Sequence, residues 1–537
     1  YFQNKLAGAI GYGFALTDHR IALMTPIVDM LPLLDEVSQS DSQDQEVSKE
    51  ILWAPDEGTG QILQRENPAS LVFVPAQTPL LLGGFSPRAQ KHLLGEFQRL
   101  GLSVSAQPGG GLSAGQAPLE PGSAFAVQLM RGDVNASAIG TVTYIKDGYM
   151  LGFGHPFLNR GKVNFLLTGA TVHRSIPSIS VPFKLGSPTE SLGSIKADRG
   201  AGVAGVLGEE PPLIELLVEV EDTDRGRTSL SRVEIVDDPL LSPSLLGSAA
   251  LAALDKGLDR VGPGTAWVEL EIVGQGMPRD LVRENLFYSS MDIAAQALLE
   301  AADAVYMLTN NIFETVNLEK VTVRTRIQES RQTARIVAAQ PERQEVRPGE
   351  TIGVEVTLRP FRQEPQTICM ELTIPEDIQP GPLPVTVRAG GSYYYFTFDS
   401  LESLTPGEEG GVATNLESLE KLIDDFVDRE KNNEVILEFM PFYDQFNDFE
   451  VEEETEGEAK VAMGPLSEEE EVFQALPRME GDGGEGDFFT DTEPVKVRSK
   501  TDYVVEGSFN FELTVEAPTE EAVELKLTPR DEHCLVK

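Results

Sequence analysis

Residues 138–157, AIGTVTYIKDGYMLGFGHPF, constrain the fold of this chain most strongly, because they encode a β-hairpin around a fixed turn. Residues 139–145 alternate apolar with small or polar side chains, as a half-buried strand does. The dipeptide Asp147-Gly148 is a tight-turn signal, and residues 149–153 predict the returning strand. The hairpin therefore brings Gly154-His155-Pro156 to the end of a strand, in a turn fixed by glycine and proline.

His155 is the candidate catalytic residue of this turn. An imidazole has an unperturbed pKa near neutrality, so a histidine presented at a strand end can act as a general base. A single histidine in such a place can equally be structural. The hairpin pattern alone leaves both interpretations open.

The rest of the chain favours a mainly β protein with few helices. It has 49 Gly and 35 Pro, with Val, Thr and Ile in many short runs. At 537 residues it is too long for one ordinary domain, and three or four are expected. It contains no run of eighteen apolar residues, so we expect no membrane span in this chain.

Charge and cysteine content exclude several classes of function. With 43 Lys and Arg against 86 Asp and Glu, the net charge of −43 repels phosphate backbones, so we expect no nucleic-acid partner. The five histidines are scattered and no CxxC pair occurs, so we expect no metal site. Of the 2 cysteines, Cys369 lies in a strand-like run and is expected to be buried.

Patterning divides the chain into six predicted segments. Residues 1–37 are expected to end a domain, with strands at 6–14 and 21–25 and a helix at 26–37. Residues 119–315 form a β-barrel-like domain with a closing helix at 290–308. The remaining segments are a linker and small α/β connector (38–118), an immunoglobulin-like sandwich with an α/β extension (316–447), an acidic disordered insertion (448–491) and C-terminal strands (492–537).

Two serines outside the hairpin are explained by helices. Ser86 in GGFSPR invites interpretation as a nucleophile, but it is the expected N-cap of a helix running to about residue 100, with Pro87 at the first position. Ser248 lies in LLGSAALAAL, residues 245–254, which is a helix by composition.

The GFGHP hairpin, together with GSIKADRGAGVAG at residues 193–205, resembles the sporulation protein IVB (SpoIVB) family of serine peptidases. IVDDPLL at residues 235–241 is similar to the segment that precedes the nucleophile in that family. Residues 1–37 follow the order that closes chymotrypsin-like proteases of the HtrA type, with Ile10-Gly11 in the first strand. The resemblance covers residues 1–37 and 119–250.

The resemblance implies acyl transfer, with a serine attacking a peptide carbonyl, His155 taking its proton and backbone amides holding the oxyanion. It implies no metal or organic cofactor. The Met-Ser-Gly-Ser-Pro element of the family is not in this chain, and its expected place is a few residues before Tyr1. After residue 241, where the family has this element, the chain has the helix at 245–254. This indicates either a duplicated half-unit, whose downstream copy carries the histidine, or a degenerate and inactive copy of the protease domain.

Two aspartates are candidates for orienting His155. Asp198 lies in the glycine-rich stretch beside Arg199, which would hold it ionised if the two side chains pair. Asp238 precedes Pro239. Either can instead be a turn or surface carboxylate.

The sequence thus predicts an extracytoplasmic serine-endopeptidase-like protein, in the periplasm, at the cell surface or secreted, which acts on a protein or peptide substrate. The alternative is a non-catalytic cell-envelope protein that binds or assembles with an envelope partner through a degenerate protease barrel. The apparent absence of the serine and the acidic insertion favour this alternative.

Overall fold

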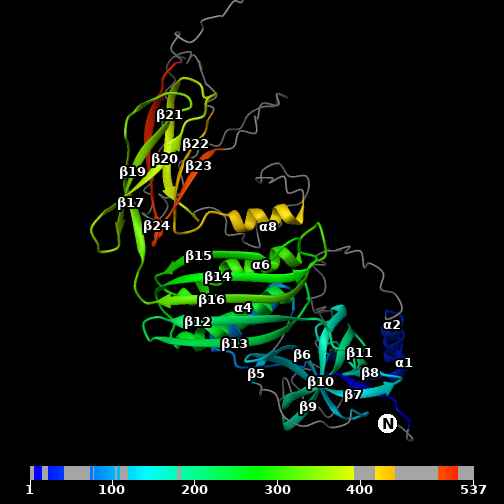
Figure 1. Cartoon of the computed structure of the whole chain (residues 1–537). Helices are drawn as coiled ribbons and strands as arrows, with labels where there is room; N and C mark the ends of the chain where they lie inside the picture. The colour runs from blue at the N-terminus through cyan, green and yellow to red at the C-terminus, as the bar shows by residue number, and fades with distance from the viewer. Residues whose placement is uncertain are drawn as a thin grey trace, which may run out of the picture. The chain divides into compact units, whose positions relative to one another are not determined.

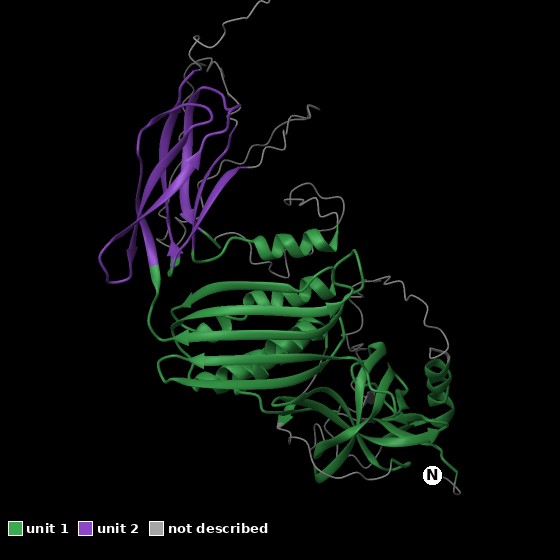
Figure 2. Ribbon diagram, viewed as in Figure 1, with its two compact units in different colours: residues 1–333, 390–433, 502–504 green, residues 334–389, 434–501, 505–537 purple. Residues whose placement is uncertain are grey.

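The structure is a computed structural model that describes residues 5–14, 22–40, 73–75, 78–102, 106–108, 119–177, 183–391, 418–441 and 494–517. It is mainly β, as the sequence predicts (Figure 1). Two compact units are present: unit 1 comprises residues 1–333, 390–433 and 502–504, and unit 2 the rest (Figure 2). The acidic segment at 448–491 lies outside the described residues.

Six strands of unit 1 pair into a closed ring in which all neighbours are antiparallel, in the order β6-β9-β10-β11-β8-β7 and back to β6. The strands are β6 (Ala124–Gly132), β7 (Asn135–Lys146), β8 (Tyr149–Gly152), β9 (Gly161–Ile176), β10 (Phe183–Arg199) and β11 (Gly202–Leu207). The predicted hairpin is confirmed as β7 and β8. Asp147 and Gly148 turn between them with positive φ angles of 52° and 85°.

A separate three-stranded sheet, in the order β2-β1-β3, is formed by the N-terminal segment. Its strands are β1 (Gly8–Phe14), β2 (Ala22–Pro26) and β3 (Phe73–Pro75). The single helix expected at 26–37 is two helices, α1 (Ile27–Met30) and α2 (Pro32–Ser40), because Leu31 ends the first. Met30 and Val37 from these helices share a buried cluster with Leu151 and Ala204 of the ring.

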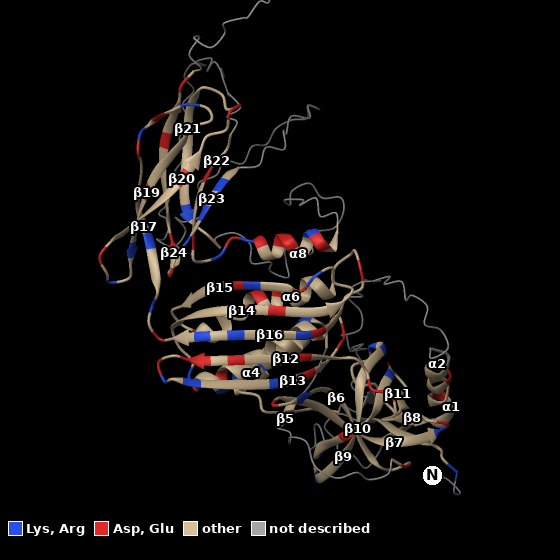
Figure 3. Cartoon of the chain, in the orientation of Figure 1, with Lys and Arg blue, Asp and Glu red and all other residues tan. Residues whose placement is uncertain are grey.

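Pairing of β6 with β13 continues the ring into a five-stranded layer with the order β15-β14-β16-β12-β13. Its strands are β12 (Leu213–Asp222), β13 (Arg227–Val236), β14 (Gly264–Gln275), β15 (Leu281–Ser289) and β16 (Asn317–Gln328). On the far side of β7, β4 (Leu80–Gly83) and β5 (Ala106–Pro108) extend the same sheet. Alternate residues of β12 are buried under the helix α4 (Ser242–Leu258). Figure 3 shows acidic residues along β12 and basic residues along the neighbouring β16. Arg324 of β16 pairs with Glu269 and Glu271 of β14.

The expected strand beginning near residue 318 belongs to this layer. It is β16, which pairs in parallel with β12 and antiparallel with β14. The sequence pattern groups it with the strands of the following module because all of them alternate alike. Its partners, however, are set by tertiary packing that alternation does not encode.

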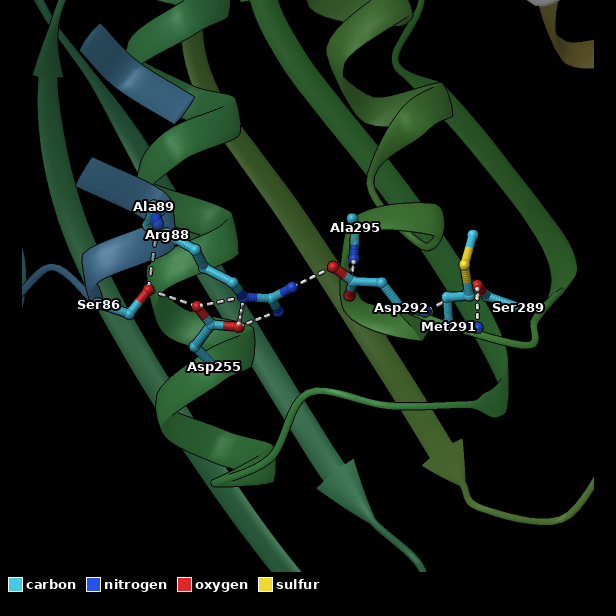
Figure 4. A network of polar contacts seen from close by, with 8 residues as sticks. All are labelled: Ser86, Arg88, Ala89, Asp255, Ser289, Met291, Asp292 and Ala295. Atoms are coloured by element: carbon cyan, nitrogen blue, oxygen red, sulfur yellow. Dashed lines mark hydrogen bonds and ion pairs between the residues drawn. The ribbon is translucent and has the colours of Figure 1, made fainter. Parts of the chain in front are cut away.

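A polar network joins the helices on this layer (Figure 4). Ser86 is confirmed as the N-cap of α3 (Pro87–Arg99), because its Oγ accepts the Ala89 amide hydrogen at 3.2 Å, and it also donates to Asp255 of α4. Arg88 bridges Asp255 and Asp292. Asp292 in turn caps α5 (Ile293–Gln296).

The helix expected at 290–308 is interrupted in the structure. It consists of α5 and α6 (Leu299–Thr309), and the N-cap of α5 is Asp292. The Asp292 carboxylate accepts the Ala295 amide hydrogen at 3.1 Å. Asp292 also pairs with Arg88, a contact that the local sequence does not reveal.

Unit 2 contains two sheets, in the orders β20-β19-β17-β24 and β18-β25-β21-β22-β23. Its strands are β17 (Thr333–Pro341), β18 (Glu345–Val346), β19 (Thr351–Pro360), β20 (Gln366–Thr373), β21 (Gly381–Ala389), β22 (Glu434–Phe439), β23 (Val495–Lys500), β24 (Val504–Glu506) and β25 (Ser508–Val515). The expectation that Cys369 is buried is wrong: it is exposed, because Met370 and Leu372 take the buried face of β20.

Arg283 of β15 links this strand to α6 through an ion pair and to the helix α8 (Leu419–Asp428) through hydrogen bonds, all within unit 1. The Arg283 side chain is only 1% exposed and donates two hydrogen bonds of 2.9 Å to Glu300 of α6. It also donates to the carbonyl oxygens of Val427 and Arg429 at 2.9 Å. Nearby on α6, burial raises the pKa of Asp303 to about 7, although the positive charge of Arg429 partly offsets this.

We expect Asp303 to make the stability of unit 1 depend on pH. Because its folded pKa of about 7 exceeds the ordinary value of 3.8, its contribution is fully present below pH 3.8 and is lost as pH rises towards 7. Asp303→Asn should remove that loss, which amounts to at most about 1.4 kcal/mol per pH unit. Thermal unfolding midpoints at pH 5 and pH 8 measure this loss. The midpoint of the variant, relative to that of wild type, should be higher at pH 8 than at pH 5. The exposed Asp280→Asn serves as control, and an equal gain there would contradict the assignment.

Candidate functional site

The turn that carries His155 follows β8 and is shaped by two residues with left-handed backbone conformations. Phe153 has a φ of 67° and Gly154 a φ of 100°. The N-terminal strand β1 passes directly against this turn. A Cβ atom on Gly11 would lie 2.0 Å from the carbonyl oxygen of Gly154, so only glycine permits this approach. Thr25 of β2 secures the contact by donating a hydrogen bond of 2.5 Å to the same carbonyl oxygen.

The His155 ring is 5% exposed and is held from three directions. Its Nδ1 lies 2.8 Å from the carbonyl oxygen of Pro156, which can only accept, so Nδ1 carries the hydrogen. Nε2 is therefore the basic nitrogen, and it lies 3.4 Å from Thr78 Oγ1. The ring stacks on Phe153 with centroids 5.1 Å apart. Burial lowers the pKa of His155, while the Pro156 hydrogen bond and the charge of Asp198 partly offset this, so the ring is neutral at neutral pH.

Asp198, the first predicted orienter, fixes the turn and does not bond to the ring. Its fully buried carboxylate accepts the amide hydrogens of Phe157 at 2.8 Å and Leu158 at 2.7 Å. Burial raises the pKa of Asp198, and these amide hydrogen bonds partly offset the shift. Its expected partner Arg199 pairs instead with Glu36, at 2.6 Å. Asp198 is thus a positioning residue for His155.

Asp238, the second predicted orienter, lies at the start of α4. It accepts the amide hydrogens of Leu240 and Leu241 at 3.0 Å each, and it lies 3.4 Å from the guanidinium of Arg160. Arg160 belongs to the same turn that Asp198 holds. The structure therefore brings His155 and Asp198 together around one turn, and connects Asp238 to that turn through Arg160.

His155 lines a pocket of about 550 Å³. Its wall combines β1, β7, the end of β9 and the start of β10, and its apolar lining includes Ile10, Ile139, Phe153, Ile176 and Phe183. Polar groups in the wall are His155, Thr78, Thr141, Ser175 and Lys184. A basic nitrogen in the wall of such a pocket can accept a proton from a group bound there.

Two residues of this pocket were not singled out from the sequence. Thr78 lies in a short apolar run next to Pro79, and nothing local marks it as a neighbour of His155. Lys184 is the only charged residue of VPFKLG at positions 181–186, and a lone lysine in such a run is a signal that could have found it.

Ser248 does not join this site. It lies on α4, as predicted from composition, and is fully buried. Its Oγ is 2.9 Å from Nδ1 of His92 on α3, a contact between two packed helices.

Within the described residues, no group of three or more His, Cys, Asp or Glu side chains is arranged to hold a metal ion. None of the helices in the described part of the chain is long and apolar enough to cross a membrane. No protein-family model, curated protein or solved structure matches this chain.

Asp198 should tune the imidazole that it positions. Replacing Asp198 with Asn removes a negative charge that raises the pKa of His155, so the pKa of His155 should fall further. Titration of the His155 ring by NMR, with the signal identified from His155→Gln, measures this shift. Asp147→Asn, in the exposed turn between β7 and β8, is the control and should leave the titration unchanged. An equal shift in both variants would show that Asp198 has no particular link to the ring.

Proposed function

We propose that this chain carries the general base and the substrate pocket of a serine-peptidase-like site, whose nucleophilic serine lies on a segment preceding Tyr1. The observation that carries the proposal is the contact of β1 with the His155 turn. The resemblance to SpoIVB-like peptidases puts the nucleophile just before this strand, and Ile10 of β1 lines the same pocket as His155.

In the proposed reaction the serine hydroxyl attacks the carbonyl carbon of a peptide bond while Nε2 of His155 takes the hydroxyl proton. The resulting imidazolium gives that proton to the departing amine, which leaves an acyl-enzyme. Water then attacks the ester carbonyl, again losing a proton to Nε2, and the imidazolium returns that proton to the serine oxygen as the acid is released. The Nδ1–H bond to the Pro156 carbonyl oxygen holds the tautomer that this sequence requires.

The finer fold assignments belong to the same proposal. The closed ring of six antiparallel strands supports a chymotrypsin-like barrel. The two sheets of unit 2 support an immunoglobulin-like module, which would bind or space rather than catalyse. An extracytoplasmic location is proposed with them, because the peptidase family that the chain resembles implies it.

One observation favours the non-catalytic alternative, a binding or scaffold protein of the cell envelope. In a serine-peptidase triad a carboxylate accepts the Nδ1 hydrogen of the histidine. Here the Pro156 carbonyl oxygen takes that place, and Asp198 is committed to main-chain amides. A main-chain carbonyl fixes the tautomer but stabilises an imidazolium less than a carboxylate does.

Labelling with a fluorophosphonate probe decides between the two functions. We expect the chain extended upstream of Tyr1 to be labelled on a serine of the added segment. His155→Gln, which keeps a polar side chain of similar length but removes the basic nitrogen, should reduce labelling at least about a hundredfold, the usual contribution of a general base.

The exposed His173→Ala is the matched control and should be labelled as wild type. Mass spectrometry then identifies the modified residue. Labelling of Thr78, or labelling that survives His155→Gln, contradicts the proposal. Absence of label from the extended wild-type chain supports the scaffold alternative.

A further inference from the structure

Lys184 of β10 places one cationic group in the wall of the His155 pocket. Its Nζ donates to Thr141 Oγ1 and to the carbonyl oxygen of Gly140, the latter at 3.4 Å. An ammonium group has three donors, so at least one remains for a further acceptor.

No carboxylate pairs with Lys184 among the residues that the structure describes, although the chain has twice as many acidic as basic residues. Burial, with no opposing charge, lowers the pKa of its ammonium. Lys196, on the same strand, pairs with Glu209 at 2.7 Å. A half-buried ammonium without a counter-charge destabilises the fold, because desolvation is not offset by attraction.

The surroundings of Lys184 restrict the kind of anion that would fit. The pocket of about 550 Å³ has walls that are about half apolar and half polar, with hydroxyl groups from Thr78, Thr141 and Ser175. A phosphate would meet a single cation here. A carboxylate on an aliphatic stem matches one ammonium, a few hydroxyl donors and the apolar part of the walls.

We propose that the pocket binds a carboxylate of a peptide, with the carboxylate oxygens accepting hydrogen bonds from Lys184 Nζ and the adjoining aliphatic atoms packing on Ile139 and Phe183. The proposal rests on the proposed function in taking the ligand to be a peptide. The carboxylate is either an acidic side chain or the C-terminal group, which share this chemistry.

Binding of matched peptides tests this inference without requiring turnover. The probes are nonapeptides of Ala and Leu with a neutral nitrobenzoxadiazole label at the N-terminus, and their dissociation constants are measured by fluorescence anisotropy. One has a central Glu and an amidated C-terminus, one a central Gln and an amidated C-terminus, and one a central Gln and a free C-terminus.

Wild type should bind one of the two carboxylate peptides about tenfold or more tightly than the Gln amide, as expected for a charge-assisted hydrogen bond. Preference for the Glu peptide identifies a side-chain carboxylate, and preference for the free acid identifies a C-terminal one. Lys184→Met should abolish the preference and Lys184→Arg should retain it. Lys146→Met, which removes an exposed lysine from the β7–β8 turn, should leave it unchanged.

Several results would overturn the inference. Wild type that binds all three peptides equally, or none of them at 1 mM, has no carboxylate subsite. Loss of preference in Lys146→Met as well shows general attraction to surface charge. The thermal midpoint of Lys184→Met should equal or exceed that of wild type, and a lower midpoint means that the ammonium is structural.

This outcome is separable from that of the peptidase proposal, because binding needs no nucleophile. Carboxylate preference without fluorophosphonate labelling leaves a peptide-binding pocket on a non-catalytic barrel. Labelling without carboxylate preference leaves a peptidase whose pocket has another specificity.

Discussion

The candidate site depends on one interaction, the acceptance of main-chain amide hydrogens by the buried carboxylate of Asp198. A turn that leaves a barrel cannot pair its amides within the strand ladder, and each buried amide left unpaired costs about 1–3 kcal/mol. Asp198 supplies the missing acceptors for Phe157 and Leu158. The turn then has one conformation, in which the Pro156 carbonyl oxygen meets Nδ1 of His155. The conformation of the turn therefore sets the orientation of the imidazole. Asp198 affects that orientation indirectly, by holding the turn.

The second constraint is the close approach of β1 to this turn. Side chains at positions 11 and 154 would drive the two backbones apart, since their Cβ atoms would overlap the opposite chain. The approach has a chemical consequence, because it makes Ile10 part of the wall beside His155. The N-terminal sheet thus completes one side of the pocket through Ile10. A change that loosened that contact would open the pocket and rehydrate the ring, which would raise the pKa of His155 towards its ordinary value.

The sequence could predict those features that depend on interactions between residues close together in the chain. The Asp147-Gly148 turn, the Ser86 cap and the helix around Ser248 are set by residues within one turn of each other, and all three are confirmed. The partners of β16, the pairing of Arg199 with Glu36 and the exposure of Cys369 depend on residues distant in the chain, and for these the local pattern was insufficient. The candidate site divides in the same way. His155 is apparent from its own hairpin, whereas its neighbours Thr78 and Lys184 come from segments 77 and 29 residues away.

The pocket combines two bases whose burial acts in the same direction. Desolvation disfavours both the imidazolium of His155 and the ammonium of Lys184, so burial lowers the pKa of each group. A bound carboxylate would reverse this shift for Lys184, since a nearby negative charge favours the protonated form. His155, in contrast, must be neutral to accept a proton. If the site binds an anion through Lys184 and removes a proton with His155, the bound anion must raise the pKa of Lys184 without raising that of His155 equally. That requires the carboxylate to lie against Lys184 and away from Nε2, where Thr78 Oγ1 already stands.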